Sequence, residues 1–442
     1  MSAPGKAFLF GEYAVLEGAR ALVAAVDVRA YAWEVLDSEA VDSVSEDPRH
    51  GWPACEATPE IVAAMEVTNA WLVEHGHDPV ENRPAVDSRR FAPGLRKLGF
   101  GSSAAVSVAT VAWMLEARGV SLDADGTRGH VHSLAKAAHH RAQGGGSGGD
   151  VAAASFGGLL SMRDGDITPL SMPSWLHLAF FDAGAPASTR SLVAEVRRAA
   201  ATDPTAYTTH MQGIRAAAER AYAGMTAEDA GEGFAAVRSA CEGHATALKG
   251  LATLAEVDLI TPSIRAVMDL ATSMGLCAKP SGAGGGDILV AFATSQADLD
   301  RLSRRVWSEL GVRPISDVEG VAEGVRLEGR AHVSSRIAGL YQRSIEARQR
   351  AVSQMAGLDQ TGWSQDAHAG FGVEQADHMI ENVVGLMSLP VGVATNFTVN
   401  GKDVLVPMCV EEASVVAAAS NAAIGAQVLP RRSVPSKTPL DS

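Results

Sequence analysis

Three separated segments carry residues that could do chemistry, and the clearest is a glycine- and serine-rich stretch near residue 100. It reads GFGSSAA, where Gly99 and Gly101 let a ligand approach the backbone closely and Ser102 and Ser103 could cap a helix or bind a metal ion. The residues that follow are apolar enough for a buried helix, whose N-terminus would attract an anion. The stretch therefore predicts a phosphate site, although its GxGxxA pattern also leaves a dinucleotide fold to be considered.

The other two segments could contact the same kind of ligand. Lys6 follows Pro and Gly and precedes an expected strand, and an ordinary turn into an edge strand explains it equally well. The run from Lys279 to Asp287 reads KPSGAGGGD, and its glycines suit either backbone contact with an anionic ligand or a flexible turn. Neither segment is decisive on its own.

The sequence pattern also indicates the elements that must position these segments. Strands are expected between Ala7 and Val35, with turns at Gly11 and at Glu17 to Gly18. A buried helix is expected from Ala104 to Arg118, and Gly119 is a plausible stop. A glycine-rich loop is therefore expected to lead directly into a helix.

Further along, a helix is expected from about Leu134. It is followed by QGGGSGGD and then by a run of small apolar residues that ends near Ser161. A second half begins near Leu176, with two or three amphipathic helices expected between Ser191 and Ser273. A buried strand, ILVAFAT, and an amphipathic stretch from Gln296 to Leu310 follow. This order fits an α+β domain that ends near Arg330.

Composition excludes several classes of protein. With 37 basic and 51 acidic residues the net charge is −14, which disfavours nucleic acid and anionic membranes as partners. No apolar run approaches the ~20 residues that cross a bilayer, and no signal peptide is recognised at the start, so a cytoplasmic enzyme is expected. The four cysteines lie far apart and predict neither a zinc site nor a disulfide framework: Cys55, Cys241, Cys277 and Cys409.

The three segments, in this order and at these separations, resemble the three motifs of the GHMP superfamily of galactokinase, homoserine kinase, mevalonate kinase and phosphomevalonate kinase. The resemblance covers about residues 1 to 325. It implies an α+β fold of two domains, an S5-like N-terminal ATP-binding domain at 1–170 and a ferredoxin-like C-terminal domain at 171–330. ATP and Mg²⁺ would bind in the cleft between them.

The resemblance also implies roles for individual residues. Lys6 would contact the transferred phosphoryl group, and Asp150 would orient that group or the acceptor. The loop from Gly99 to Ser103 would hold the ATP phosphates, with Ser102 or Ser103 on the magnesium ion. Lys6 and Asp150 are accordingly the expected catalytic pair.

Residues beside the motifs are candidates for binding the two anionic substrates. Lys97, Arg190 and Lys279 could clamp phosphates, although solvated surface charge would also explain them. Asp287 is expected to be only a turn acid. The acceptor side would be lined by residues of the third motif: Ser281, Gly282, Ala283, Gly284 and Gly285.

Within the superfamily, GEYAVLEG, RAQGGGSGGDVAAASFGG and KPSGAGGGD look most like bacterial phosphomevalonate kinases, with mevalonate kinases as the alternative. In mevalonate kinases a Glu about eleven residues before the catalytic Asp helps to hold magnesium, whereas His139 stands at that position here. The implied acceptor is 5-phosphomevalonate. His139, His140 and Arg141 could reach its phosphate, or could form a satisfied cluster at a helix end.

From about Ser334 the sequence resembles a different family, the N-terminal part of class II hydroxymethylglutaryl-CoA reductase. The resemblance rests on MIENVVG, LPVGVATNFTVNGKDVLVPM and VEEASVVAAASNAA. Glu412 falls at that family's catalytic Glu, and Glu381 to Gly385 matches a substrate-side helix motif. The family's catalytic Lys, Asp and His are expected further downstream than residue 442, so an autonomous reductase is not expected.

This third region is expected to be a small partial α+β segment at 331–424, with a hairpin turn at Asn400 and Gly401 and a disordered tail at 425–442. Its apolar faces suggest self-association or a separate reductase partner. A second hypothesis of another class is a non-catalytic scaffold built on a degenerate kinase. The presence of Lys6, Ser103 and Asp150 argues against it.

Overall fold

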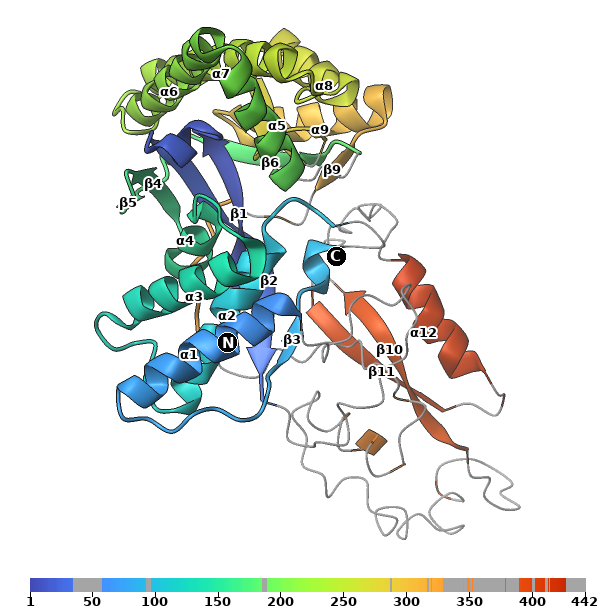
Figure 1. Cartoon of the computed structure of the whole chain (residues 1–442). Coiled ribbons are helices and arrows are strands. Elements are labelled where there is room, and N and C mark those ends of the chain that lie inside the picture. The colour runs from blue at the N-terminus through green and yellow to red at the C-terminus, as the bar shows by residue number, and fades with distance from the viewer. Residues whose placement is uncertain are drawn as a thin grey trace. The chain divides into compact units, whose positions relative to one another are not determined.

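The structure of the chain is a computed structural model (Figure 1). It describes residues 1–34, 58–92, 97–184, 189–286, 288–315, 318, 320–328, 389–399, 402–409 and 414–426, and single positions at 340, 345, 348, 349, 352, 378 and 412. The chain divides into two compact units, one of residues 1–40 and 48–330 and one of residues 41–47 and 331–442.

The first unit begins with an antiparallel sheet. Its long central strand β2 (Ala21–Trp33) pairs with β1 (Ser2–Phe10), β3 (Ala85–Asp87) and β4 (Leu159–Arg163), and β4 pairs with β5 (Asp166–Leu170). The early strands expected from the sequence are thus confirmed. Because β1 already begins at Ser2, Lys6 lies inside this strand and not before it, which corrects the expectation for its setting.

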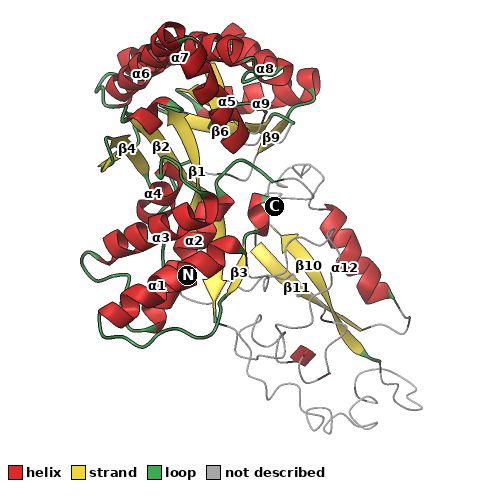
Figure 2. Cartoon of the chain, viewed as in Figure 1, coloured by secondary structure: helices red, strands yellow, loops and turns green. Residues whose placement is uncertain are grey.

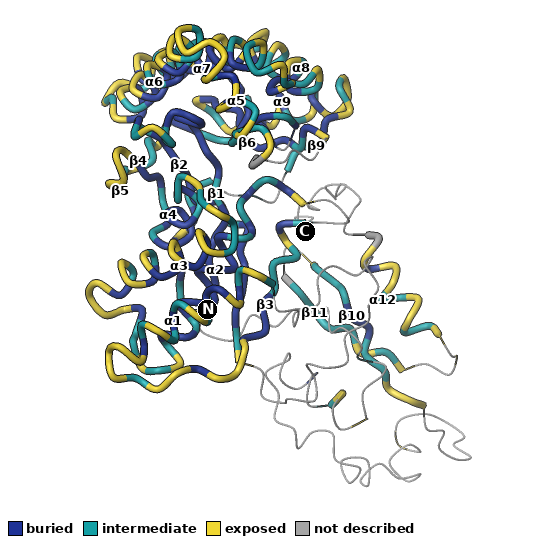
Figure 3. The backbone as a smooth tube through the Cα atoms, viewed as in Figure 1, coloured by how far each residue is buried: buried dark blue, intermediate teal, exposed yellow. Residues whose placement is uncertain are grey.

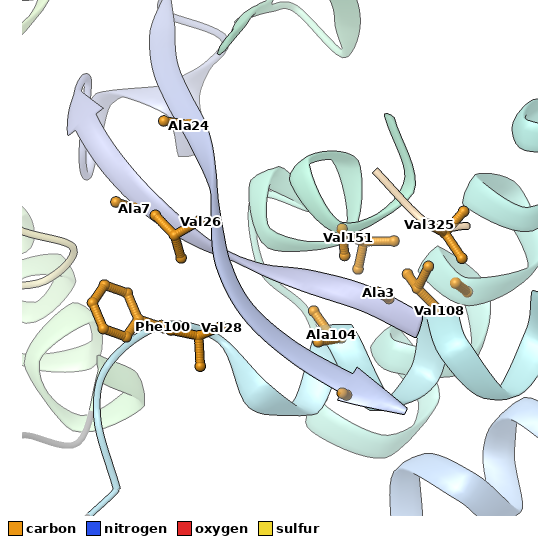
Figure 4. Close-up of a cluster of buried hydrophobic side chains, with 14 of the residues drawn as sticks. Ala3, Ala7, Ala24, Val26, Val28, Phe100, Ala104, Val108, Val151 and Val325 are labelled. Carbon is orange, nitrogen blue, oxygen red and sulfur yellow. The ribbon is translucent and has the colours of Figure 1, made fainter. Parts of the chain in front are cut away.

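Helices α2 (Ser102–Ala117) and α4 (Gly149–Phe156) pack on this sheet, and α1 (Pro59–Glu74) and α3 (Thr127–Gln143) pack on α2 and on each other. Helix α2, which confirms the expected helix, is buried along nearly its whole length because its sequence is almost all apolar or small. Alternate β2 residues such as Ala24, Val26 and Val28 form a core with Ala104 and Val108 of α2 (Figure 4). This packing fixes where α2 begins.

The second half of the unit is a four-stranded antiparallel sheet in the order β7 (Cys277–Ser281), β8 (Ile288–Ala293), β6 (His177–Asp182), β9 (Arg313–Ile315). With the helices counted in chain order, this is the βαββαβ arrangement of a ferredoxin-like domain, as expected. Strand β8 is buried at all six positions, because Leu289 and Ala291 face one core and Val290 and Phe292 face another. The buried strand predicted from ILVAFAT is confirmed.

The helices of this half cover the sheet, as Figure 2 shows: α5 (Thr189–Thr202), α6 (Pro204–Met225), α7 (Ala230–Ala255), α8 (Pro262–Ser273) and α9 (Gln296–Leu310). Four of them lie in the region where two or three were predicted. The three breaks come at Asp203, Asp229 and Thr261. Their side chains accept hydrogen bonds from the amides of Ala206, Glu232 and Ile264 and so begin new helices.

After β9 the chain returns to the first sheet. Ser2 and Arg326 exchange backbone hydrogen bonds, and the fully buried Arg29 donates to the carbonyls of Glu323 and Gly324 at 2.8 and 2.7 Å. Strands β1 and β2 are accordingly buried over most of their length (Figure 3). The two halves of the first unit therefore share an ordered return segment.

In the second unit, strands β10 (Val391–Val399) and β11 (Lys402–Cys409) pair antiparallel, and helix α12 (Val415–Ala426) packs on β10. The two strands of the predicted hairpin are confirmed, while the turn residues Asn400 and Gly401 lie outside the described residues. Helix α12 runs two residues into the segment expected to be a disordered tail, and 427–442 are not described.

Among the residues that the structure describes, no helix combines the length and the apolar character that a membrane span requires.

Candidate active site

Strand β1 brings Lys6 against the glycine-rich loop. Its backbone amide donates to the carbonyl of Phe100 at 2.8 Å, and its ammonium donates to the carbonyl of Gly99 at 3.0 Å. Gly5 permits this close approach, because a Cβ there would lie 2.7 Å from the Phe100 carbonyl oxygen. The predicted lysine and the predicted phosphate loop are thus joined by two hydrogen bonds.

The loop leads directly into the N-terminus of α2. Gly101 is the residue before the helix and has φ +79°, a conformation that favours glycine, and no side chain caps the helix. The first backbone N–H groups of α2 lack partners within the helix, so they can bind an anion and carry the positive end of the helix dipole. A Cβ on Gly101 would lie 3.2 Å from Lys6 Cγ and 3.5 Å from Asp150 Cβ, so loop, lysine and aspartate meet at this point.

Asp150 lies in the first turn of α4, whose preceding residue Gly148 also has a positive φ and adds no side-chain cap. Its Oδ1 accepts from the amide of Val151 at 2.9 Å, and its Oδ2 lies 3.7 Å from Nε2 of His139. That Nε2 is also 3.2 Å from the hydroxyl of Ser103. His139 therefore lies between the serine of α2 and the aspartate of α4, and of the three residues His139, His140 and Arg141 it is the one in contact with both.

The loop after β7 reaches the same place from the second half of the unit. A Cβ on Gly282 would lie 3.8 Å from Nζ of Lys6. Gly282, Gly284, Gly285 and Gly286 have φ values of +95°, +80°, +78° and +122°. Consecutive backbone turns of this kind direct N–H groups into a concave surface that suits an anion. The prediction of a loop holds for Gly282 onward, whereas Lys279 to Ser281 belong to strand β7.

Lys279 is not a candidate for the phosphate clamp, contrary to expectation. Its side chain is fully buried, and its ammonium donates to Glu12 Oε1 and to the carbonyl of Pro280 at 2.5 Å. His244 Nε2 lies 3.2 Å from Glu12 Oε2. Since a buried ammonium with a carboxylate partner is already neutralised, Lys279 compensates Glu12 and not a substrate phosphate.

The ionisation of this buried cluster follows from its contacts. Burial alone would raise the pKa of Glu12, but the charges of Lys279 and His244 outweigh it and hold that pKa well below its usual range. Burial, reinforced by the Lys279 ammonium, lowers the pKa of His244. The cluster therefore favours a Glu12 carboxylate paired with the Lys279 ammonium and disfavours a second cation on His244.

The remaining predicted residues fall into different settings. Lys97 is exposed, and the side chain of Arg190, near the start of α5, lies outside the described part. Ser281 is 4% exposed, and its hydroxyl has no hydrogen-bond partner within the described residues. A buried hydroxyl next to the Gly282 loop is suited to donate to a bound anion. Asp287 is not described.

The two residues that follow His139 have different settings. Arg141 forms an ion pair with Glu66 at 3.1 Å, and His140 is exposed at the end of α3. In the second unit Glu412 is exposed, and Glu381 to Gly385 lie outside the described residues.

Glu12 and Tyr13 were not identified as functional residues from the sequence. Tyr13 Oη donates to the carbonyl of Ala283 at 2.6 Å, and the amide of Gly282 donates to Glu12 Oε1 at 3.4 Å. The signal that could have found them is an acid in the otherwise apolar run FLFGEYAVL, where a buried charge requires a partner.

Family comparisons agree with this geometry. The model of the GHMP kinases N terminal domain matches residues 90–158, which include the loop, His139 and Asp150, and the model of the GHMP kinases C terminal domain matches residues 236–313. The chain therefore contains the N- and C-terminal domains of a GHMP kinase.

Individual relatives indicate which kinds of GHMP kinase this chain is similar to. The phosphomevalonate kinase of Streptomyces sp. strain CL190 is 29% identical over 367 residues, which are 71% of this chain and 95% of that protein. The mevalonate kinase of Thermococcus gammatolerans is 30% identical over 210 residues, 45% of this chain and 61% of that protein. The structure of Streptococcus pneumoniae phosphomevalonate kinase with phosphomevalonate and AMPPNP has the same fold, with a TM-score of 0.57 at 19% identity over 73% of this chain and 99% of that one.

The second unit has a separate relationship. The hydroxymethylglutaryl-coenzyme A reductase model matches residues 344–427. The reductase of Archaeoglobus fulgidus is 51% identical over 94 residues, which are 21% of this chain but only 22% of that protein. The chain thus joins residues that match both GHMP kinase domain models to a segment homologous to about a fifth of a reductase.

Proposed function

We propose that the chain transfers the γ-phosphoryl group of ATP to the phosphate of 5-phosphomevalonate, forming 5-diphosphomevalonate and ADP. The observation that carries the proposal is the meeting of four groups: Lys6, the N-terminus of α2, Asp150 and the Gly282 loop. Two polyanions must be brought together in this reaction, and positive charge and backbone N–H groups supply the attraction they need.

The residues present suit a magnesium nucleotide. The Gly99–Gly101 loop and the first turn of α2 would hold the ATP phosphates, and Lys6 would contact the transferred group. Mg²⁺ is commonly held by one or two carboxylates together with substrate phosphates. Asp150, which is 24% exposed, and the Ser103 hydroxyl offer oxygen ligands of this kind. When bound, the ion would neutralise charge on the phosphates.

The acceptor chemistry requires little base catalysis. A phosphate monoester has a second pKa near 6, so at neutral pH it is largely a dianion. Its oxygen attacks the γ-phosphorus, the bond from that phosphorus to the β-bridging oxygen breaks, and ADP leaves with the electron pair. The chain therefore has to align the two substrates and neutralise the charge of their phosphates. We assign Asp150 to orienting the reacting groups.

Two observations favour phosphomevalonate over mevalonate as the acceptor. The phosphomevalonate kinase relative matches over 95% of its length, against 61% for the mevalonate kinase. In addition, His139 occupies the position of a magnesium-binding Glu in mevalonate kinases, and it lies between Ser103 and Asp150. A neutral or cationic ring there is more favourable beside a second phosphate than a carboxylate would be.

An ADP-release assay with mevalonate, 5-phosphomevalonate and 5-diphosphomevalonate tests the proposal. We expect turnover with 5-phosphomevalonate and much poorer turnover with mevalonate. Lys6→Ala and Asp150→Ala should each lower turnover by a few powers of ten, whereas Lys249→Ala, at an exposed lysine of α7, should not. Equal or better turnover of mevalonate, or decarboxylation of the diphosphate, would overturn the assignment.

For the second unit we propose no independent catalysis. Glu412 is exposed, and the homologous segment amounts to 22% of the reductase relative. The chain alone should not oxidise reduced nicotinamide in the presence of hydroxymethylglutaryl-CoA. Residues 334–424 instead supply an association surface for a second copy or for a reductase chain, which light scattering of the full chain and of a chain ending at Arg330 tests.

A further inference from the structure

We propose that Tyr13 is a positioning residue for the acceptor side of the site, holding the Gly282–Gly286 loop in register with Lys6 through its hydrogen bond to Ala283. This inference rests on the proposed kinase function. It concerns Glu12 and Tyr13, in the turn after β1. Neither residue was given a role in substrate binding from the sequence.

The first step is that the loop is held at three points by residues from distant parts of the chain. Tyr13 Oη donates to the Ala283 carbonyl at 2.6 Å. The amide of Gly282 donates to Glu12 Oε1 at 3.4 Å, and the amide of Gly285 donates to the Leu259 carbonyl at 3.0 Å. Two of these three anchors come from the Glu12–Tyr13 turn, so that turn determines where the loop lies.

The second step is that the turn itself is rigidly held. Tyr13 is 6% exposed and belongs to the buried cluster of the second half, with residues such as Leu259, Ala278 and Leu289. Its φ is +62°, which a tyrosine rarely adopts and which persists only where the surroundings enforce it. Glu12 is fixed in turn by Lys279 and His244. The chain thus stores backbone strain beside a loop that faces Lys6.

The third step concerns the chemistry of the contact. Burial, and next the charge of Glu12, raise the pKa of Tyr13, so its hydroxyl stays protonated and donates at any physiological pH. The acceptor is a loop carbonyl, so the bond orients the Ala283 peptide while the neighbouring N–H groups remain available to an anion. Glycine-rich loops have few side-chain contacts of their own, which makes one such anchor decisive for their position.

The consequence is that binding of the two substrates should depend differently on Tyr13. The nucleotide side, formed by Gly99 to Ser103 and Lys6, has its own contacts with β1 and does not depend on Tyr13. Removal of the Tyr13 hydroxyl should therefore weaken binding of 5-phosphomevalonate and leave binding of ATP nearly unchanged. A merely structural residue would affect both to a similar extent.

The variant Tyr13→Phe tests this, because it removes one oxygen and keeps the ring that packs in the core. Tyr207→Phe is the matched control, since the hydroxyl of Tyr207 donates at the same distance of 2.6 Å but to Glu17 Oε1, which is not part of the loop. We expect Tyr13→Phe to raise the KM for 5-phosphomevalonate roughly ten-fold, with the KM for ATP changed less than two-fold. Tyr207→Phe should change neither.

Hydrogen exchange of the full chain gives a readout that is independent of turnover. In Tyr13→Phe the peptide spanning Gly282 to Gly286 should exchange several-fold faster than in the wild type and in Tyr207→Phe, while β8 keeps its protection. Unchanged exchange of this peptide would overturn the anchoring itself, whether or not the kinase function holds. Faster exchange with an unchanged acceptor KM would overturn the positioning role, and absence of wild-type turnover would overturn the proposed function and the acceptor assignment with it.

Discussion

Replacing Lys279 by Met should destabilise the first unit strongly, because it removes the cation that neutralises a buried carboxylate. Lys279 is fully buried and Glu12 is 3% exposed, so water cannot replace the missing charge. Met preserves most of the aliphatic stem and its packing beside Phe10. Lys279→Met therefore removes the positive charge with little change in side-chain volume.

The expected magnitude is about 3–5 kcal/mol, the usual cost of breaking a buried ion pair on one side. For a domain of this size each kcal/mol lowers the thermal midpoint by roughly 2 °C, which predicts a midpoint lower by about 6–10 °C at pH 8. Adding Glu12→Gln to the same chain should restore most of the loss, because no uncompensated charge then remains inside.

The pH dependence should also change sign. In the wild type the pKa of Glu12 is below its ordinary value of 4.5 and that of His244 is below 6.5, so their contributions to stability are present at high pH and are lost as pH falls. In Lys279→Met the folded chain takes up a proton, on Glu12 or on His244, that the unfolded chain lacks. That contribution is present at low pH and is lost as pH rises.

The assay is the thermal midpoint of the first unit, measured by calorimetry of the full chain at pH 6, 7 and 8. Lys279→Met should gain up to about 1.4 kcal/mol of stability per pH unit on going down this range, while the wild type gains nothing. A loss below about 1 kcal/mol at pH 8, or a variant whose midpoint falls on acidification as that of the wild type does, would refute the reasoning.

Three further predictions address the loop, the return segment and the second unit. Gly101→Ala places a Cβ 3.2 Å from Lys6 Cγ at a φ of +79°, so steady-state turnover should fall at least ten-fold while the midpoint drops by only a few degrees; unaltered turnover would contradict the role given to the loop. Arg29→Met removes hydrogen bonds to Ser2 Oγ and to three backbone carbonyls, and should cost about 2–4 kcal/mol in denaturant unfolding. An unchanged midpoint would argue against the return segment as a structural tie. A chain ending at Arg330 should keep kinase turnover within about two-fold and change its mass in light scattering, and a large loss of turnover would show that the second unit is needed for the reaction.

Local features of this protein were predictable because their causes are local. The glycines and serines of GFGSSAA, followed by apolar helical text, predicted a loop leading into a buried helix, and α2 begins at Ser102. The apolar run ILVAFAT predicted the buried strand β8. The Asn400–Gly401 signal predicted a hairpin, and β10 and β11 pair accordingly. The number of helices between Ser191 and Ser273 was underestimated, because single capping residues, Asp203, Asp229 and Thr261, interrupt a continuous amphipathic pattern.

The sequence alone was enough to predict the order of elements, the glycine-rich loop before α2 and the family resemblance, since these depend on residues close together in the chain. The roles of Lys6 and Asp150 remain predictions, but the tertiary structure alone brings them to one place. It also decided that Lys279 compensates Glu12, 267 positions away, and that Tyr13 holds Ala283, 270 positions away. A lysine beside a glycine-rich motif has the same sequence signature whether it faces solvent, a phosphate or a buried carboxylate. Only the packing of β7 against the turn after β1 decides that Lys279 faces a buried carboxylate. The reason is that the energy of a charge depends on its burial and its partner and not on its neighbours in sequence.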